Sequence, residues 1–239
     1  AMKALMRMLR IMARDGITPG MAQLVLTSLT TALARVTKNP GNPHYNHYLF
    51  ESIAILVASV YRREPHLTGS FEAVLFPPFQ NVLNKDVSEL TPYVFQVLAQ
   101  VLEFRPEGLG PAYGALFQPL LSPCIWTREG NVPALTRLIT VYLEKAPTDF
   151  LGTYLQDMIG IFRMLVASPK HEVNGFDLLK SLTLHMPPID IPYQEVYDVL
   201  LTRLQDAGTL RYYLCVTNYF SLWTGKFGGQ AWVSVLDSM

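Results

Sequence analysis

The sequence predicts an all-α protein, an α-α superhelix in which about five helical hairpins stack in a row. Apolar residues recur at three- and four-residue steps, and no useful length of the chain shows the period-two alternation of strands. Pro and Gly interrupt the apolar segments at intervals. Half of the 239 residues are apolar and 16% are charged, which excludes a disordered chain. Lys and Arg together number 19, as do Asp and Glu, which argues against a dedicated nucleic-acid binder.

The expected helices follow one another with short breaks, and several carry start signals. Thr18 can cap a helix that begins at Pro19, because Pro at the first helical position loses no hydrogen bond. Asp86 and Glu89 have the spacing of a capping box, and Asn131 can cap another helix. The expected helices span approximately 2–14, 19–37, 44–63, 71–84, 87–104, 111–121, 132–145, 149–167, 172–185, 192–207 and 209–224, with a partial helix from 230.

Two of these expected helices contain residues that predict an interruption or a cap. Pro77 and Pro78 fall inside the helix 71–84 and predict a kink or a split, because proline lacks the amide donor and clashes with the preceding turn. Either Thr148 or Asp149 is expected to cap the helix that follows it.

Pairing the helices gives hairpins whose spacing is close to the ~40–47-residue period of HEAT and armadillo arrays. We therefore expect one HEAT-repeat array over residues 1–239, itself a segment of a longer solenoid. A compact helical bundle is the alternative, but it would need fewer and longer helices without a constant offset. The expected repeats are approximately 19–64, 67–104, 111–146, 149–187 and 192–225.

Residues with a recognisable chemical pattern are scarce. His44 and His47 share a helix face, but no Asp, Glu or Cys at ligand-like spacing completes a metal site. Glu51 lies in an apolar helix, where a buried carboxylate is more often a hydrogen-bond partner of a neighbouring helix than a general base. We expect no catalytic residue, no metal and no cofactor. An all-helical enzyme that uses Cys124 or Glu51 is kept as an alternative.

Cysteine usage and hydropathy point to an intracellular chain without a membrane span. Cys124 and Cys215 have apolar neighbours and no paired spacing, which predicts two buried free thiols in a reducing compartment. The most apolar segment, 17–34, is broken by Pro19 and Gly20, so no helix is expected to insert into a membrane.

Aromatic side chains gather near the end of the chain. We expect them to pack in the core, with a protein-binding hot spot as the alternative. The cluster consists of Tyr212, Tyr213, Tyr219, Phe220 and Trp223.

Four stretches across most of the chain form a recognisable pattern in this order: NPHYNHYLFESI (42–53), TPYVFQVL (91–98), GNVPALTRL (130–138) and LHMPP (184–188). None is decisive alone, and together they are specific. They resemble the importin-α re-exporters, nuclear export receptors of the importin-β (karyopherin-β) superfamily.

The resemblance implies a HEAT-repeat transport receptor without enzymatic activity, of which this chain holds part of the C-terminal half. Such a receptor binds importin-α together with GTP-bound Ran, passes nuclear pore proteins and shuttles between nucleus and cytoplasm. Its main Ran-binding region lies in N-terminal repeats that this chain lacks. A HEAT-repeat scaffold subunit of another multiprotein complex, of the phosphatase or condensin type, is the alternative.

Partner contacts are expected on the second helix of each hairpin, which would line the concave face of the solenoid. Polar positions there that could contact a protein partner are basic. The candidates are Arg62, Arg63, Arg137, Lys145 and Lys180.

Overall fold

The computed structural model describes residues 1–106, 108–187, 190–207 and 210–227, and within these ranges every regular element is a helix. The predicted all-α fold is confirmed. Two compact units, Ala1–Gly108 and Leu109–Met239, divide the chain. The elements are α1 (Met2–Asp15), α2 (Pro19–Val36), α3 (Pro43–Tyr61), the 3-10 helix η1 (Pro65–Leu67), α4 (Thr68–Asn84), α5 (Thr91–Phe104), α6 (Pro111–Leu120), α7 (Pro123–Trp126), α8 (Val132–Lys145), α9 (Thr148–Gly152), α10 (Leu155–Val166), α11 (Glu172–His185), α12 (Tyr193–Ala207) and α13 (Leu210–Phe227).

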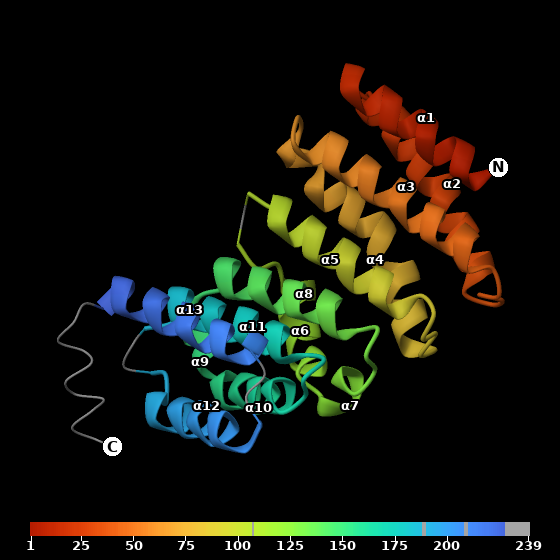
Figure 1. The fold of residues 1–239 in the computed structure, drawn as a ribbon. Helices are drawn as coiled ribbons and strands as arrows, with labels where there is room; N and C mark the ends of the chain where they lie inside the picture. Colours follow the sequence, from red (N-terminus) through yellow and green to blue (C-terminus); the bar gives the residue numbers. More distant parts are fainter. Residues whose placement is uncertain (107, 188–189, 208–209, 228–239) are drawn as a thin grey trace. The chain divides into compact units, whose positions relative to one another are not determined.

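The first unit consists of two layers of helices (Figure 1). The helices α1, α3 and α5 pack side by side in one layer, and α2 packs beside α4 in the other. Each hairpin joins the layers, because α2 contacts α3 and α4 contacts α5. A hairpin buries its apolar stripe only when a neighbour covers it, and this arrangement is that of a helical repeat array.

Aromatic rings connect the hairpins of the first unit. The ring centre of Phe50 on α3 lies 5.1 Å from that of Tyr93 on α5 and 6.3 Å from that of Phe79 on α4. Phe50 and Phe79 are buried. Such stacked pairs add about 0.5–1.5 kcal/mol to the free energy gained by burying their surface.

Of the two helix caps predicted in the first unit, the cap at Thr18 is present and the capping box at Asp86 and Glu89 is not. The Thr18 hydroxyl accepts a hydrogen bond from the Met21 amide, so the predicted cap is confirmed. The capping box at Asp86 and Glu89 is wrong, because α5 begins only at Thr91 and Asp86 takes a positive φ of 52° in the turn before it.

The two prolines of α4 do not split it. The helix continues from Thr68 to Asn84 through Pro77 and Pro78, so the predicted split is wrong, and the kink that was the alternative stays a prediction. The buried residues of α4 lie on both sides of the prolines, with Leu75 before them and Phe79 after them. Apolar packing on both flanks thus offsets the hydrogen bonds that proline removes.

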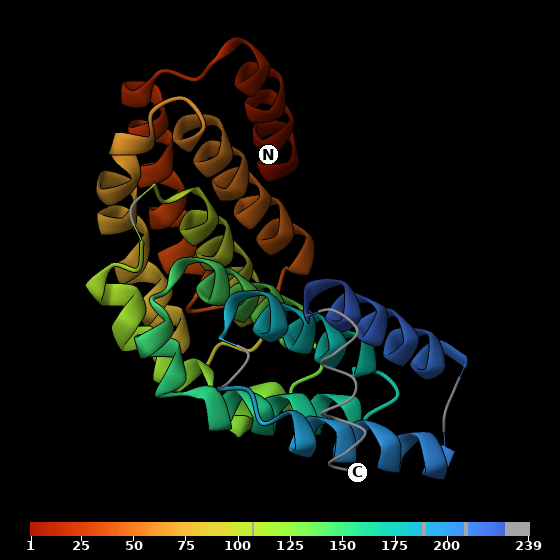
Figure 2. The same ribbon diagram turned by 90° about the vertical axis from the view of Figure 1, so that its left-hand side faces the viewer.

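The second unit repeats the two-layer plan (Figure 2). The helix α11 packs between α8 and α13 in one layer, and α10 packs beside α12 in the other. The contacts of α10 with α11 and of α12 with α13 form two hairpins. A third is formed by α6 and α8, where the Tyr142 hydroxyl donates to the Tyr113 carbonyl at 2.9 Å and the rings of Phe117 and Tyr142 are 4.6 Å apart.

Helices of the second unit differ from the sequence prediction in how they are divided and in how they are capped. The expected helix 149–167 is two helices, α9 and α10, and the N-cap of α9 is Pro147 and not Thr148 or Asp149. Gly152, which has a low helix propensity, is the last residue of α9. Asn131 is the N-cap of α8, but its amide group donates to the Ile125 carbonyl and makes no cap bond. The expected partial helix from 230 lies outside the described residues.

Within the hairpin of α10 and α11 the two backbones approach closely at Gly175. A Cβ atom at this position would lie 2.7 Å from Cγ1 of Val166. Glycine is therefore required here for close packing, although it costs helix propensity.

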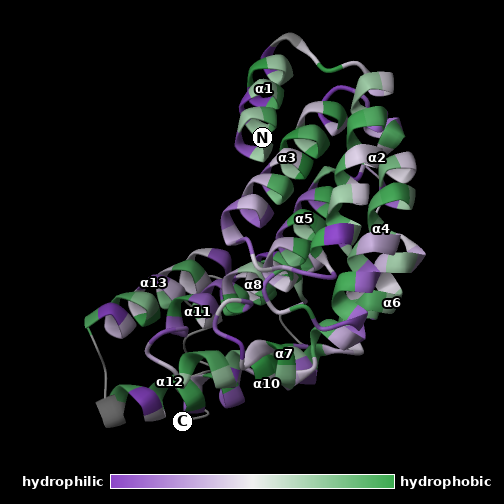
Figure 3. Ribbon diagram, turned by 90° about the vertical axis from the view of Figure 1, so that its right-hand side faces the viewer, coloured by the Kyte–Doolittle hydropathy of each residue, from purple (hydrophilic) through white to green (hydrophobic). Residues whose placement is uncertain are grey.

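Individual helices carry both hydrophilic and hydrophobic residues, as α3 and α13 show in Figure 3. Among the described residues, no helix combines the length and the apolar character needed to cross a membrane.

Candidate functional site

An open groove of about 370 Å³ lies between α8 and α11 in the second unit. On each helix the lining residues recur at three- and four-residue steps, so they share one helix face. The lining residues are Pro133, Thr136, Arg137, Thr140 and Glu144 from α8, and Asn174, Asp177, Lys180, Ser181, Leu184 and His185 from α11.

The groove carries charges of both signs. The helix α8 contributes Arg137 and Glu144, and α11 contributes Asp177 and Lys180. Partial burial raises the pKa of Asp177, and the nearby Lys180 ammonium opposes this rise. A surface with both signs on each helix suits a protein partner with complementary charges better than a polyanion such as a nucleic acid.

One buried polar atom of the groove has no hydrogen-bond partner. The Ser181 residue is only 3% exposed, and its Oγ has no partner among the described residues. The hydroxyl of Thr136, in contrast, donates to the Val132 carbonyl at 2.8 Å. A buried hydroxyl without a partner costs about 1–3 kcal/mol, and Ser181 carries this cost at the base of the groove.

The structure brings two of the five predicted contact residues together. Arg137 and Lys180 line the groove from α8 and α11. Lys145 ends α8, half-buried, and is not among the lining residues. The binding roles of these residues stay predictions.

The other two predicted contact residues lie at the end of α3, in the first unit. The Arg62 guanidinium lies 5.6 Å from the ring centre of Phe104, a cation–π contact with α5. Arg63 donates to the Arg14 carbonyl of α1 at 3.3 Å. Both side chains therefore contact neighbouring helices of their own unit.

Sequence reasoning missed Asn174, Asp177 and Ser181, which line the groove from α11. Their spacing of three and four residues puts polar side chains on one helix face, and this signal is present in the sequence. That α11 turns this face toward α8 follows only from the tertiary structure.

A second groove, of about 420 Å³, lies between α10 and α12. Arg163 of α10 and Glu195 of α12 form an ion pair there. The apolar part of the lining consists of Val166, Ala167 and Val199.

The residues considered for catalysis occupy structural or surface positions. Arg10 of α1 donates to Glu51 at 3.2 Å, so the predicted hydrogen bond to a neighbouring helix is confirmed, although the carboxylate is half-exposed and not buried. Both cysteines are free thiols as predicted, but Cys124 is exposed and Cys215 half-buried. In the four-residue helix α7 it is Trp126 that is buried, which leaves Cys124 on the surface. No group of three His, Cys, Asp or Glu side chains in the described ranges could hold a metal ion.

The aromatic cluster near the chain end is mainly core, as predicted. Tyr212, Tyr219 and Trp223 are buried and Phe220 is half-buried. Tyr213 differs, because it is 47% exposed.

Two-layer stacks of helical hairpins with an open groove along one layer define a HEAT-type helical-repeat protein, a class that binds partners along extended surfaces. A family model described as the C-terminus of the CAS/CSE protein matches residues 1–239. The chain belongs to the CAS/CSE family.

Similar proteins extend this assignment. The chain is 37% identical to Exportin-2 of Pagrus major and 35% identical to Exportin-2 of Homo sapiens, each over 243 residues that cover all of this chain and 25% of the relative. A solved structure of the exportin Cse1 in its cargo-free, cytoplasmic state matches 96% of this chain and 24% of that chain, with a TM-score of 0.85 and 31% identity. The resemblance to export receptors and the HEAT-repeat fold are thereby confirmed, and the chain spans about a quarter of the length of these relatives.

Proposed function

We propose that this chain is a segment of a nuclear export receptor that binds importin-α together with GTP-bound Ran and returns importin-α to the cytoplasm. Similarity to Exportin-2 over the complete chain, at 37% identity, is the observation that carries the proposal. It favours an export receptor over a HEAT-repeat scaffold subunit of another complex. The receptor shuttles between nucleus and cytoplasm through contacts with nuclear pore proteins, and it has no enzymatic activity of its own.

The α8–α11 groove is the part of this chain that we assign to partner contact. Arg137 and Lys180 supply cations, and Glu144 and Asp177 supply anions. A protein segment with both acidic and basic side chains has charges complementary to these groups. Apposed complementary charges chiefly set the specificity and the rate of such an association.

The fold suits a receptor that binds two partners at once. Contacts in a helical repeat array are made between neighbouring hairpins, so small rotations at each junction change the curvature. If importin-α and GTP-bound Ran favour the same curvature, each raises the affinity for the other by the same factor.

Calorimetric titration of importin-α into the full-length receptor that contains this chain, with and without GTP-bound Ran, tests the proposal. We expect binding that tightens when GTP-bound Ran is present. Equal affinities would contradict the coupling, and no binding under either condition would contradict the proposed function. A pull-down with a protein unrelated to importin-α serves as the control for nonspecific association.

A further inference from the structure

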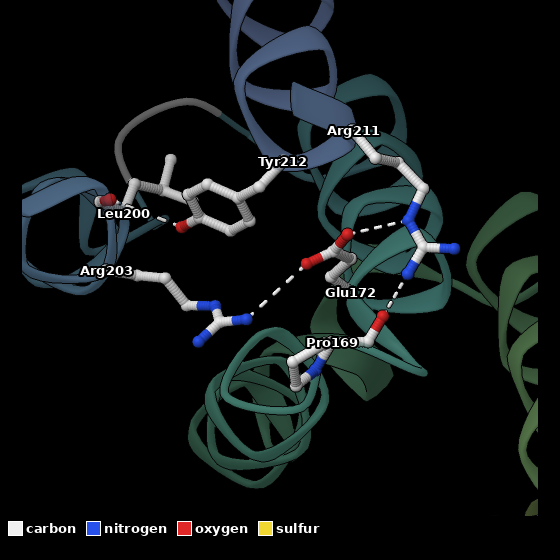
Figure 4. A network of polar contacts seen from close by, with 6 residues as sticks. All are labelled: Pro169, Glu172, Leu200, Arg203, Arg211 and Tyr212. Atoms are coloured by element: carbon white, nitrogen blue, oxygen red, sulfur yellow. Dashed lines mark hydrogen bonds and ion pairs between the residues drawn. The ribbon is translucent and has the colours of Figure 1, made fainter. Parts of the chain in front are cut away.

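A buried carboxylate outside the groove joins three helices of the second unit (Figure 4). Glu172, the first residue of α11, has a fully buried side chain. Its Oε1 accepts from Nε of Arg211, in the first turn of α13, at 2.7 Å. Its Oε2 accepts from Nη2 of Arg203, on α12, at 3.5 Å. One negative charge thus contacts both helices of the last described hairpin.

The hairpin of α12 and α13 has aromatic packing of its own. The ring centres of Tyr197 and Phe220 are 5.5 Å apart, and those of Tyr193 and Trp223 are 5.8 Å apart. The Tyr212 hydroxyl donates to the Leu200 carbonyl at 3.2 Å, which ties α13 to α12. These contacts remain within the hairpin if it moves away from α11.

Polar contacts accompany apolar packing where this hairpin meets its neighbours, such as the contact of the Phe176 ring on α11 with the Tyr212 ring on α13, whose centres are 5.5 Å apart. Beside Glu172, the Arg211 guanidinium donates to the Pro169 carbonyl. At the opposite end of α11, the Lys226 ammonium donates to the carbonyls of Thr183 and Leu184, where a cation suits the helix dipole. Arg163 of α10 pairs with Glu195 of α12.

Glu172 differs from the other charged groups of this attachment, because its side chain is fully buried and binds two arginines. The Arg203 side chain is 15% exposed, its guanidinium lies 5.3 Å from the ring centre of Tyr212, and its Nε has no hydrogen bond among the described residues. Without the carboxylate, Arg203 would be a largely buried cation that has lost its ion-pair partner. Such a group is strongly unfavourable, and it reaches water when α12 moves outward.

We propose that Glu172 is a latch that holds the hairpin of α12 and α13 on α11, and that the hairpin opens as one unit when this carboxylate no longer binds Arg203 and Arg211. Opening of such cooperative units, at a free energy below that of global unfolding, is a general property of proteins. The latch goes beyond the proposed partner binding and does not depend on it.

Amide hydrogen exchange of the complete chain, wild type against Glu172→Gln, tests the latch. We expect exchange in peptides from 193–207 and 210–227 to accelerate about tenfold or more, because breaking a buried ion pair is strongly destabilising. Peptides from 91–104 and 132–145 should keep their rates. A uniform acceleration across the chain would show a general structural role and overturn the proposal, as would unchanged rates.

Two further variants keep the test decisive if Glu172→Gln fails to fold. Arg211→Ala removes one half-exposed partner and should give the same regional pattern at smaller size. The double variant Glu172→Gln/Arg203→Met also removes the arginine that has lost its ion-pair partner. It should regain part of the protection against hydrogen exchange that Glu172→Gln loses. A double variant that exchanges faster than Glu172→Gln would contradict the latch. Glu129→Gln, which breaks an exposed pair with Lys170, is the matched control and should leave all rates unchanged.

Discussion

Each unit contains a buried carboxylate paired with arginine, but the two pairs join different elements. In the first unit, Glu72 of α4 accepts from Arg105, which directly follows α5, at 2.5 Å. This pair closes a single hairpin. In the second unit, Glu172 of α11 binds Arg203 and Arg211 of the next hairpin.

The difference indicates what each pair stabilises. Loss of the Glu72 pair disturbs the hairpin of α4 and α5 from within. Loss of the Glu172 pair leaves the hairpin of α12 and α13 intact and weakens its attachment. Similar buried chemistry therefore contributes to folding of a repeat in one case and to stacking between repeats in the other.

The largest effect is expected from Glu72→Gln, which removes the ion pair of Glu72 with the largely buried Arg105. Breaking such a pair should lower the free energy of unfolding of the first unit by about 3–5 kcal/mol. Urea denaturation, monitored by hydrogen exchange in peptides of the first unit, measures it. Exchange should accelerate in both α4 and α5, in contrast to the pattern expected for Glu172→Gln.

The control for this prediction replaces both charges. In Glu72→Leu/Arg105→Met no unpaired charge remains, and stability should return close to that of the wild type. A double variant as unstable as Glu72→Gln would show that packing around Glu72, and not its charge, explains the loss.

An intermediate effect is expected from Gly175→Ala, which tests packing inside the hairpin of α10 and α11. The added methyl group overlaps Val166, and such overpacking costs about 1–3 kcal/mol. Gly160→Ala on α10 is the matched control, since its Cβ meets no atom within 4 Å and alanine favours a helix by about 0.5–1 kcal/mol. Thermal unfolding measures both variants, and equal melting temperatures would contradict the close approach at Gly175.

The smallest effect is expected at the exposed pair of Glu129 and Lys170. The hydrogen bond from the Lys170 ammonium lowers the pKa of Glu129 below its ordinary value. A lowered folded-state pKa contributes stability that is present above the unfolded pKa and is lost as the pH falls through the folded pKa. Lys170→Ala should return the pKa of Glu129 toward its ordinary value in an NMR titration. An unchanged pKa would show that the pair does not form in solution.

Apolar periodicity and capping residues predicted most of the helices. They did not predict the backbone conformation of the turns between the helices. Thr18 was found because a cap and the following proline lie next to each other in sequence. Asp86 and Glu89 have the spacing of a cap, but the positive φ of Asp86 puts them in a turn. Cys124 has apolar neighbours, yet a helix of only four residues cannot bury all of its faces.

The groove was partly predictable. Arg137 and Lys180 were found because they are polar positions on second helices of hairpins. Asp177 and Ser181 were missed, because their role depends on how α11 packs against α8. The partners of Glu172 lie 31 and 39 residues further along the chain, a separation that helix periodicity alone does not connect.

Charge reversal in the groove tests the assignment of partner contact to α8 and α11 most directly. The double variant Arg137→Glu/Lys180→Glu should weaken importin-α binding in the presence of GTP-bound Ran about tenfold or more, because each reversal opposes a complementary charge. Circular dichroism should show that the double variant remains folded, and Lys170→Glu, an exposed reversal outside the groove, should bind normally. Unchanged affinity in the double variant would contradict the account.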